Sequence, residues 1–331
     1  MQTDSPRSKP LRGKLTVLVV RLALLAGSLV LLFHLVDISR LIVTFRRVTP
    51  AAYLLAIGIA VSRCWLVAMR WRLLNSDPTT QLNRWQYFRY VMLSNTFNLF
   101  MPGSLGGDVI RSILVLQEVD SQRGANLLAI VVDRVIGLAS ILILGSIACL
   151  AAPTLPERWR YLLMFTILIV GFLLAIGLAV SNSFHRGIET LSNRLGPIGQ
   201  KALQLLGSWQ AALVFYRSNP RKVLFALLLC LPIHIAWFLV VFVLSRSIGV
   251  NLSLWGIGVV TSLSWVVTAF PLTISGLGVR ELSFVYLLSF QGVAPDPATA
   301  LSVCSFSVTV LLGVLGAPFI LLGRLRTRGR E

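Results

Sequence analysis

Long apolar runs separated by short polar stretches dominate this chain of 331 residues. An α-helix needs roughly 20 mainly apolar residues to cross the hydrocarbon core of a bilayer, and six of the runs are about that long. They cover about 15–36, 51–70, 125–150, 160–180, 222–246 and 298–322. The pattern therefore predicts an all-α polytopic membrane protein with six full transmembrane helices.

Two further apolar regions, about 85–118 and 253–291, are broken near their middles by proline and glycine. The interruptions read "MPGSLGGDVIR" (101–111) and "PLTISGLGVRE" (271–281). Each remaining arm has roughly 12–18 residues and spans only part of about 30 Å of hydrocarbon at 1.5 Å per residue. We therefore predict two re-entrant helical hairpins, each entering and leaving on one side of the membrane.

The distribution of lysine and arginine sets the expected orientation. With the amino terminus inside, the inner segments hold 19 of these residues and the outer segments hold six. Because orientation follows such positive charges, both termini are expected in the cytoplasm, as in a multi-pass protein of the cytoplasmic (inner) membrane. Three crossings separate the two interrupted regions, so these regions would open to opposite sides and form an inverted repeat.

We predict a single integral membrane domain over residues 1–331, with halves of about 12–150 and 160–325. The most polar stretch, 181–221, is itself amphipathic and is expected on the cytoplasmic surface. The first run is longer than the roughly 7–15 apolar residues of a signal-peptide core, so we expect it to be a retained helix.

Composition supports a membrane protein and excludes several other classes. Hydrophobic residues make up 56% of the chain and charged residues only 13%, against roughly 25% in soluble domains. The net charge of +18 comes from clusters at the ends of apolar runs, so no nucleic-acid partner is predicted. The four cysteines and three histidines lack the spacing of a metal site, and no nucleotide-binding motif occurs. We therefore predict no metal and no cofactor.

The first interruption combines a helix break with groups suited to an anion. Pro102 and Gly103 end one arm, Ser104 can cap the next, and Gly106 and Gly107 permit unusual backbone angles or close packing. A lipid-facing backbone cannot leave its polar groups unpaired, so this break must face protein or a water-filled cavity. The free amides of the new helix then form a site suited to an anion.

Charged residues follow both interruptions. Asp108 and Arg111 lie three residues apart and share a helix face, so a local ion pair with a capping role is one interpretation. The second interruption repeats this chemistry, with Ser275, Gly276 and Gly278 followed by Arg280 and Glu281. Two matching interruptions in opposite halves point to the substrate site of a transporter.

A third charged pair, Asp133 and Arg134, lies about a third of the way into a full crossing. Neighbouring helical residues point about 100° apart, so each of these two needs a partner on another segment. Such residues are functional candidates, although they alternatively only tie helices together. The deep charges balance at three acids and three arginines, unless Arg63 faces the cavity rather than snorkelling to the cytoplasmic surface.

Three motifs in order carry a family resemblance: "NLFMPGSLGGDVIRSILV", "DRVIGLAS" and "FPLTISGLGVRELSF". Over residues 12–325 the chain resembles the flippase-like membrane proteins related to the transmembrane region of lysylphosphatidylglycerol synthase. The resemblance implies a bacterial or archaeal inner-membrane protein that moves or modifies lipids. Its implied lipid partners are aminoacylated phospholipids, hopanoid-related lipids and polyprenyl-phosphate-linked sugars.

The family patterns map onto the interruptions and onto the charged pair of the full crossing. The resemblance places them at Pro102, Gly103, Gly106, Gly107, Asp108 and Arg111, at Asp133, Arg134 and Gly137, and at Pro271, Gly276, Gly278 and Glu281. Ile274 and Ser275 replace a proline and a glycine of the last pattern, so a less sharp turn is expected there. The soluble transferase domain of the synthase is lacking, so we assign no lipid aminoacylation.

The leading hypothesis is a flippase-like lipid translocator, not an enzyme, that moves a lipid with an anionic or zwitterionic headgroup across the inner membrane. The alternatives are a membrane enzyme or accessory subunit that modifies lipid-linked substrates, and a structural membrane scaffold. The oligomeric state stays open. The candidate substrate-binding residues are Gly103, Ser104, Gly106, Gly107, Asp108, Arg111, Asp133, Arg134, Ser275, Gly276, Gly278, Arg280 and Glu281.

Overall fold

The structure is a computed structural model, and a large part of the chain is described in it. The described residues are 43, 46–75, 82–99, 105–118, 123–180, 218–270, 273 and 275–320. The predicted first crossing and nearly all of the amphipathic segment 181–221 lie outside them. Among the residues of the interruptions, Pro102, Gly103, Ser104 and Pro271 also lie outside the described residues.

Every regular element in the described ranges is an α-helix, which confirms the predicted fold class. The helices are α3 (Pro50–Leu74), α4 (Arg84–Asn98), α5 (Leu105–Glu118), α6 (Arg123–Ala151), α7 (Arg158–Val180), α10 (Pro220–Ser247), α11 (Leu254–Ala269), α12 (Val279–Ser289) and α13 (Pro295–Gly316). Within these ranges α3, α6, α7, α10 and α13 are long and apolar enough to cross a membrane. They coincide with five of the six predicted crossings.

Local sequence signals set where several helices begin. Thr49 accepts a hydrogen bond from the backbone of Ala52 at the start of α3, and Pro50 occupies the first helical turn, where its missing N–H is harmless. Asn83 and Gln86 form a reciprocal capping box at the start of α4. These caps fix the ends of helices whose interiors are held by packing.

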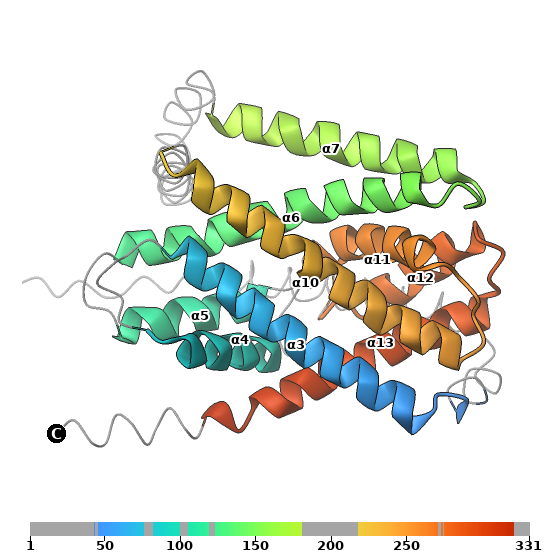
Figure 1. The fold of residues 1–331 in the computed structure, drawn as a ribbon, viewed down its shortest axis with the longest axis horizontal. Helices are drawn as coiled ribbons and strands as arrows, with labels where there is room; N and C mark the ends of the chain where they lie inside the picture. Colours follow the sequence, from blue (N-terminus) through green and yellow to red (C-terminus); the bar gives the residue numbers. More distant parts are fainter. Residues whose placement is uncertain are drawn as a thin grey trace, which may run out of the picture.

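Each interrupted region forms two short helices, as the sequence predicts. Helices α4 and α5 have 15 and 14 residues, and α11 and α12 have 16 and 11. The two members of each pair pack against each other. In Figure 1 the long helices run roughly horizontally, with α4 and α5 toward the left end and α11 and α12 toward the right. Hairpins from opposite sides would give this arrangement, while the inverted repeat itself stays a prediction.

The long helices alternate in direction along the chain. Helices α3, α7 and α13 run from the right end of the molecule to the left, and α6 and α10 run the other way (Figure 1). The helix ends that the charge distribution places inside therefore gather at one end of the bundle. Which end faces the cytoplasm remains a prediction.

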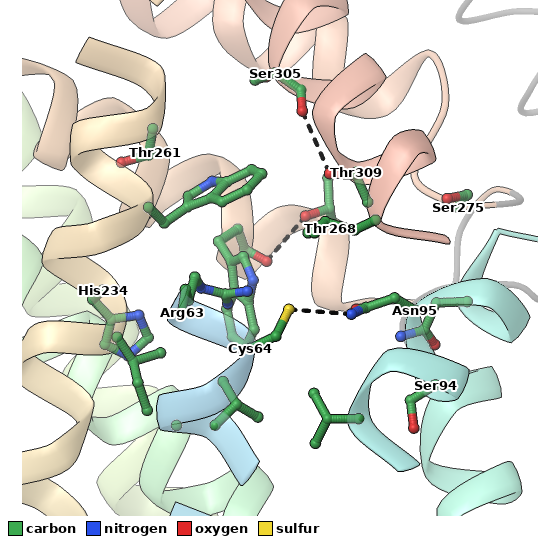
Figure 2. Close-up of a pocket in the computed structure, with 18 of the residues that line it drawn as sticks. Arg63, Cys64, Ser94, Asn95, His234, Thr261, Thr268, Ser275, Ser305 and Thr309 are labelled. Carbon is green, nitrogen blue, oxygen red and sulfur yellow. Dashed lines mark hydrogen bonds between the residues drawn. The ribbon is translucent and has the colours of Figure 1, made fainter. Parts of the chain in front are cut away.

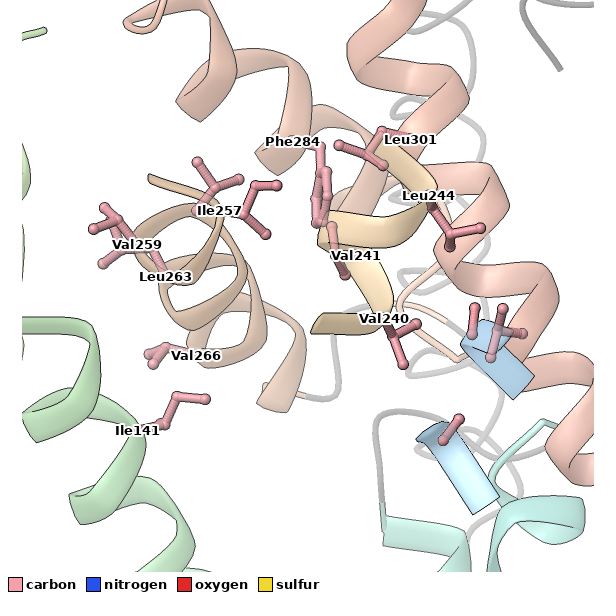
Figure 3. Packing of buried hydrophobic residues seen from close by; sticks show 14 of the residues in the cluster. Ile141, Val240, Val241, Leu244, Ile257, Val259, Leu263, Val266, Phe284 and Leu301 are labelled. Carbon is pink, nitrogen blue, oxygen red and sulfur yellow. The ribbon is translucent and has the colours of Figure 1, made fainter. Parts of the chain in front are cut away.

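The main cluster of buried apolar side chains draws on α3, α4, α6, α10, α11, α12 and α13, with a smaller contribution from α7. Figure 3 shows Val241 and Leu244 of α10 close to Phe284 and Leu301, with Ile257 of α11 beside them. All five side chains are almost completely buried. Helix α7 differs, because its apolar side chains such as Leu163, Ile167 and Leu174 are mostly exposed. This face suits contact with lipid.

Small residues let α13 approach α4 closely. Thr96 of α4 donates a hydrogen bond to the carbonyl oxygen of Gly313 over 2.7 Å. A Cβ atom on Gly316 would overlap the carbonyl oxygen of Met92. Such backbone contacts through small residues are a common way for membrane helices to associate.

We predict that Gly316→Ala destabilises the protein by about 1–3 kcal/mol, because the added methyl meets backbone that cannot move aside. Denaturant titration of the purified protein in detergent would measure this change. The control is Gly171→Ala on α7, where an added Cβ meets nothing within 4 Å among the described residues. Its stability should be unchanged or raised by up to about 1 kcal/mol, because alanine favours helix. Equal effects of the two changes would contradict the proposed α4–α13 contact.

Candidate functional site

A cavity of about 270 Å³ lies inside the bundle. Every described helix except α7 contributes to its wall, and both interrupted regions reach it through Arg111 of α5 and Arg280 of α12. Figure 2 shows part of the polar lining, with Arg63 and Cys64 on α3 and Thr268 and Thr309 on other helices. Its charged lining residues are Arg63, Arg70, Arg111, Arg134, Arg280 and Asp133.

Asp108 binds two of these arginines. Its Oδ1 lies 2.9 Å from Nη2 of Arg111, one turn along α5. Its Oδ2 accepts a hydrogen bond from Nε of Arg134 on α6. The local pair that the sequence predicts is therefore present, and the same carboxylate also joins α5 to α6.

Asp133 makes the complementary connection from α6. Nε of Arg70 on α3 donates to Oδ1 of Asp133 over 2.7 Å, and both side chains are buried. Nη1 of Arg111 lies 3.6 Å from Oδ2, which is an ion-pair distance but longer than a hydrogen bond. The prediction that Asp133 and Arg134 have partners on other segments is confirmed. Three helices, α3, α5 and α6, are thus joined through two carboxylates.

Arg280 and Glu281 form a separate pair on α12. Nε and Nη2 of Arg280 both lie 3.2 Å from Oε1 of Glu281. The other carboxylate oxygen accepts the backbone N–H of Gly278 over 2.6 Å, so Glu281 also caps its own helix. The guanidinium of Arg280 lies 4.0 Å from the ring centroid of Phe306. Arg280 therefore lines the cavity while Glu281 holds it in place.

The turn before α12 has left-handed backbone angles, including at the serine that replaces a family glycine. Ser275, Gly276 and Gly278 have φ angles of 53°, 73° and 79°, all in the left-handed region. Serine adopts this conformation at a moderate energetic cost. Pro271 and Ile274 lie outside the described residues, so the expectation of a less sharp turn stays a prediction. Ser275 and Arg280 both line the cavity.

We predict that Ser275→Gly stabilises the protein by about 0.5–1 kcal/mol, because glycine removes the left-handed strain but loses more chain entropy. Ser275→Ala is the control, since alanine keeps the strain and should bring no gain. Denaturant titration in detergent distinguishes the two. A gain with alanine as large as that with glycine would show that backbone strain is not the cause.

Gly107 allows α5 to lie close against α4. Its backbone N–H donates to Oδ1 of Asn98 over 2.6 Å, and its carbonyl accepts the hydroxyl of Ser94 over 3.0 Å. A Cβ atom here would lie 2.8 Å from both of these side chains. Gly106 is the second residue of the same helix. The predicted anion site at the free amides depends on Gly103 and Ser104, which lie outside the described residues.

Arg70 is a site residue that the sequence motifs do not include, and for Arg63 the sequence allowed two positions. Arg70 counted among the charges on the cytoplasmic side, whereas the structure buries it against Asp133. Arg63 does not snorkel to the surface, because it lines the cavity and its guanidinium lies 5.4 Å from the ring centroid of Trp237. Arg63, Val67 and Arg70 recur at the spacing of one helix face, and that signal was available in the sequence.

Around the cavity the arginines therefore outnumber the acids. The described cluster contains five arginines, namely Arg63, Arg70, Arg111, Arg134 and Arg280. The acids in contact with them are Asp108, Asp133 and Glu281. The cluster consequently carries two more positive than negative charges, rather than the even balance counted from the sequence.

Uncharged polar residues complete the site. His234 lines the cavity and shares a 2.9 Å hydrogen bond with Ser140, so its ring is held within the bundle. Among the described residues there is no group of three or more side chains of the types that commonly hold a metal ion.

We predict that Asp133→Asn destabilises the protein by about 3–5 kcal/mol, because it leaves Arg70 buried without its charged partner. The matched control is Glu157→Gln, whose 3.1 Å pair with Arg160 is largely exposed. That change should cost no more than about 1 kcal/mol. Unfolding in denaturant would compare the two, and similar small effects would contradict a structural role for the Asp133 ion pairs.

The fold and site together define a polytopic membrane protein whose broken helices meet at a charged internal cavity. The chain belongs to the family described as lysylphosphatidylglycerol synthase TM region, whose model matches residues 18–317. It is also similar to a UPF0104 membrane protein of Methanocaldococcus jannaschii. The two are 25% identical over 228 residues, which cover 66% of this chain and 91% of that protein.

Proposed function

We propose that this protein is a lipid translocator that moves a lipid with an anionic or zwitterionic headgroup across the inner membrane. The observation that carries this proposal is the shared cavity, since both interrupted regions contribute an arginine to it. Transporters place substrate near the midplane, between broken helices in corresponding positions of two halves. The inverted repeat, with both termini in the cytoplasm, is part of the same proposal.

The size of the cavity supports transport of a headgroup rather than uptake of a whole lipid. Its volume of about 270 Å³ is below the roughly 300–1,000 Å³ typical of pockets that enclose a drug-sized molecule. A phosphate with a small polar substituent would fit, while acyl chains would stay in the surrounding hydrocarbon. The exposed apolar side chains of α7 show that parts of the bundle already suit such a surrounding.

The arginines and acids have distinct proposed roles. Arg111, Arg134 and Arg280 would contact the headgroup, because planar guanidinium groups match phosphate oxygens. Asp108, Asp133 and Glu281 would hold these arginines between transport events, or carry protons. The sequence contains no nucleotide-binding motif, so we propose movement along an ion gradient, along the gradient of the lipid, or toward equilibration.

Proteoliposomes test this function directly. A membrane-impermeant quencher reaches only the fluorescent phosphatidylglycerol in the outer leaflet of the vesicles. We predict that the protein raises the quenched share above one half, because it moves lipid from the inner leaflet to the outer one. Arg134→Gln should slow this movement at least about tenfold, the loss of one charge-assisted contact. Arg160→Gln, at an exposed position on α7, should leave the rate unchanged.

Mass spectrometry of the same lipid separates the alternatives. A changed lipid mass would favour an enzyme or accessory subunit. Intact lipid that stays in its leaflet, with the protein folded by circular dichroism, would favour a scaffold. Either result would contradict translocation.

A further inference from the structure

Arg63 differs from the other arginines around the cavity. Arg70, Arg134 and Arg280 each lie against a carboxylate. Within the described part of the chain Arg63 has no ion pair, and its Nε is buried without a hydrogen-bond partner. Leaving a buried charged donor unsatisfied is unfavourable, so a ligand that pairs with it gains an interaction that the protein does not supply.

Arg111 adds two more donors to the same space. Its Nη2 is held by Asp108, and Nε is buried without a hydrogen-bond partner among the described residues. Nη1 also makes no hydrogen bond there, since the 3.6 Å to Oδ2 of Asp133 is an ion-pair distance only. Its guanidinium lies 5.4 Å from the ring centroid of Trp71, as that of Arg63 lies against Trp237. An aromatic ring therefore orients each of these arginines, and some N–H groups of each guanidinium remain available to a ligand. Guanidinium forks of this kind match phosphate oxygens.

Hydroxyl groups on α11 and α13 line the same cavity and can accept hydrogen bonds, whereas the arginines can only donate them. The hydroxyls of Thr261, Thr268, Ser305 and Thr309 each donate to a carbonyl of their own helix, over 2.8, 2.9, 2.8 and 3.4 Å. Since a hydroxyl has one proton and two lone pairs, these oxygens remain acceptors toward the cavity. They suit the donor groups of a ligand, such as its own hydroxyls.

The charge of the lining distinguishes a hydroxyl donor from an ammonium donor. Among the described residues that line the cavity, the acidic one is Asp133, and its carboxylate already pairs with Arg70. An ammonium group would therefore meet an excess of positive charge without an unpaired carboxylate. Hydroxyl groups carry no charge and need only the acceptor oxygens.

We infer that the cavity binds a phosphodiester headgroup bearing hydroxyl groups, with its phosphate on Arg63 and Arg111 and its hydroxyls on the threonines and serine of α11 and α13. This inference rests on the proposed function and gives its substrate class. Arg63 lies in none of the three sequence motifs and becomes a binding residue for the phosphate. A phosphate ester next to hydroxyl groups occurs both in a phosphoglycerol lipid, as a diester, and in free glycerol phosphate, as a monoester.

Binding, rather than transport, is the appropriate readout, because it separates failure of this inference from failure of the proposed function. The purified full chain in detergent is incubated with phosphatidylglycerol and phosphatidylcholine, and retained lipid is counted by native mass spectrometry. We expect at least about tenfold preference for phosphatidylglycerol. Equal retention of the two lipids would overturn the inference, even if the protein translocates lipid.

Three variants test which residues bind the headgroup. Arg63→Gln should weaken phosphatidylglycerol binding by about ten- to a hundredfold, the range for hydrogen bonds to charged groups. Arg72→Gln is the matched control, since Arg72 is exposed on the same helix. Thr268→Val should weaken binding of phosphatidylglycerol but not of phosphatidic acid, which lacks the glycerol hydroxyls. Equal losses in Arg63→Gln and Arg72→Gln would indicate general surface attraction and overturn the inference.

Stability gives a readout that a purely structural role would not produce. Without lipid, Arg63→Gln should unfold at the same or a higher denaturant concentration than the natural protein, because it removes an unpaired buried charge. Loss of stability together with loss of binding would show that Arg63 serves packing, and would overturn the inference. Glycerol phosphate added as a competitor distinguishes a lipid headgroup from a free phosphate ester as the ligand. Displacement of bound phosphatidylglycerol by glycerol phosphate supports the proposed headgroup site. Binding of glycerol phosphate by a protein that shows no preference between the two lipids contradicts a lipid headgroup as the ligand.

Discussion

Two carboxylates, Asp108 and Asp133, make the central arrangement of this protein possible. Helix α5 is too short to cross a membrane and begins just after a helix break. Its charged residues are stable inside the bundle only when they are paired, because an isolated charge in a nonpolar environment is strongly unfavourable. Asp108 joins α5 to α6, and Asp133 joins α6 to α3. The short helix is thereby fixed to two long helices at the wall of the cavity.

The ion pairs in turn depend on close backbone packing. Gly107 brings α5 against Ser94 and Asn98 of α4, and Gly316 brings α13 against the backbone of the same helix. Helix α4 is consequently packed on both α5 and α13. A displacement of α4 would shift Arg111 relative to Asp133, whose 3.6 Å separation is already loose. Packing glycines and charged residues therefore act together, although they lie on different helices.

The sequence predicts much of the fold because apolar length and helix-breaking residues are local properties. Five described crossings and two divided regions follow from such signals. It also indicates that Asp133 and Arg134 need outside partners, since neighbouring helical residues point about 100° apart. It does not identify Arg70 as a partner of Asp133, because 63 residues separate them and only the packing of α3 on α6 brings them together. The left-handed Ser275 is likewise held by surrounding structure rather than by its own preference.

In the proposed function, the small excess of positive charge affects transport as well as binding. A carrier must bind its substrate well enough to capture it and weakly enough to release it, as ion pathways through membranes also do. A cavity of five unpaired arginines would hold a phosphate too firmly in a site of low dielectric constant. Here three carboxylates hold Arg70, Arg134 and Arg280, and two of them, Asp108 and Asp133, also lie at ion-pair distance from Arg111. In the proposed function an arriving phosphate would meet mainly the available donors of Arg63 and Arg111, and the carboxylates would compete for Arg111 when the headgroup leaves.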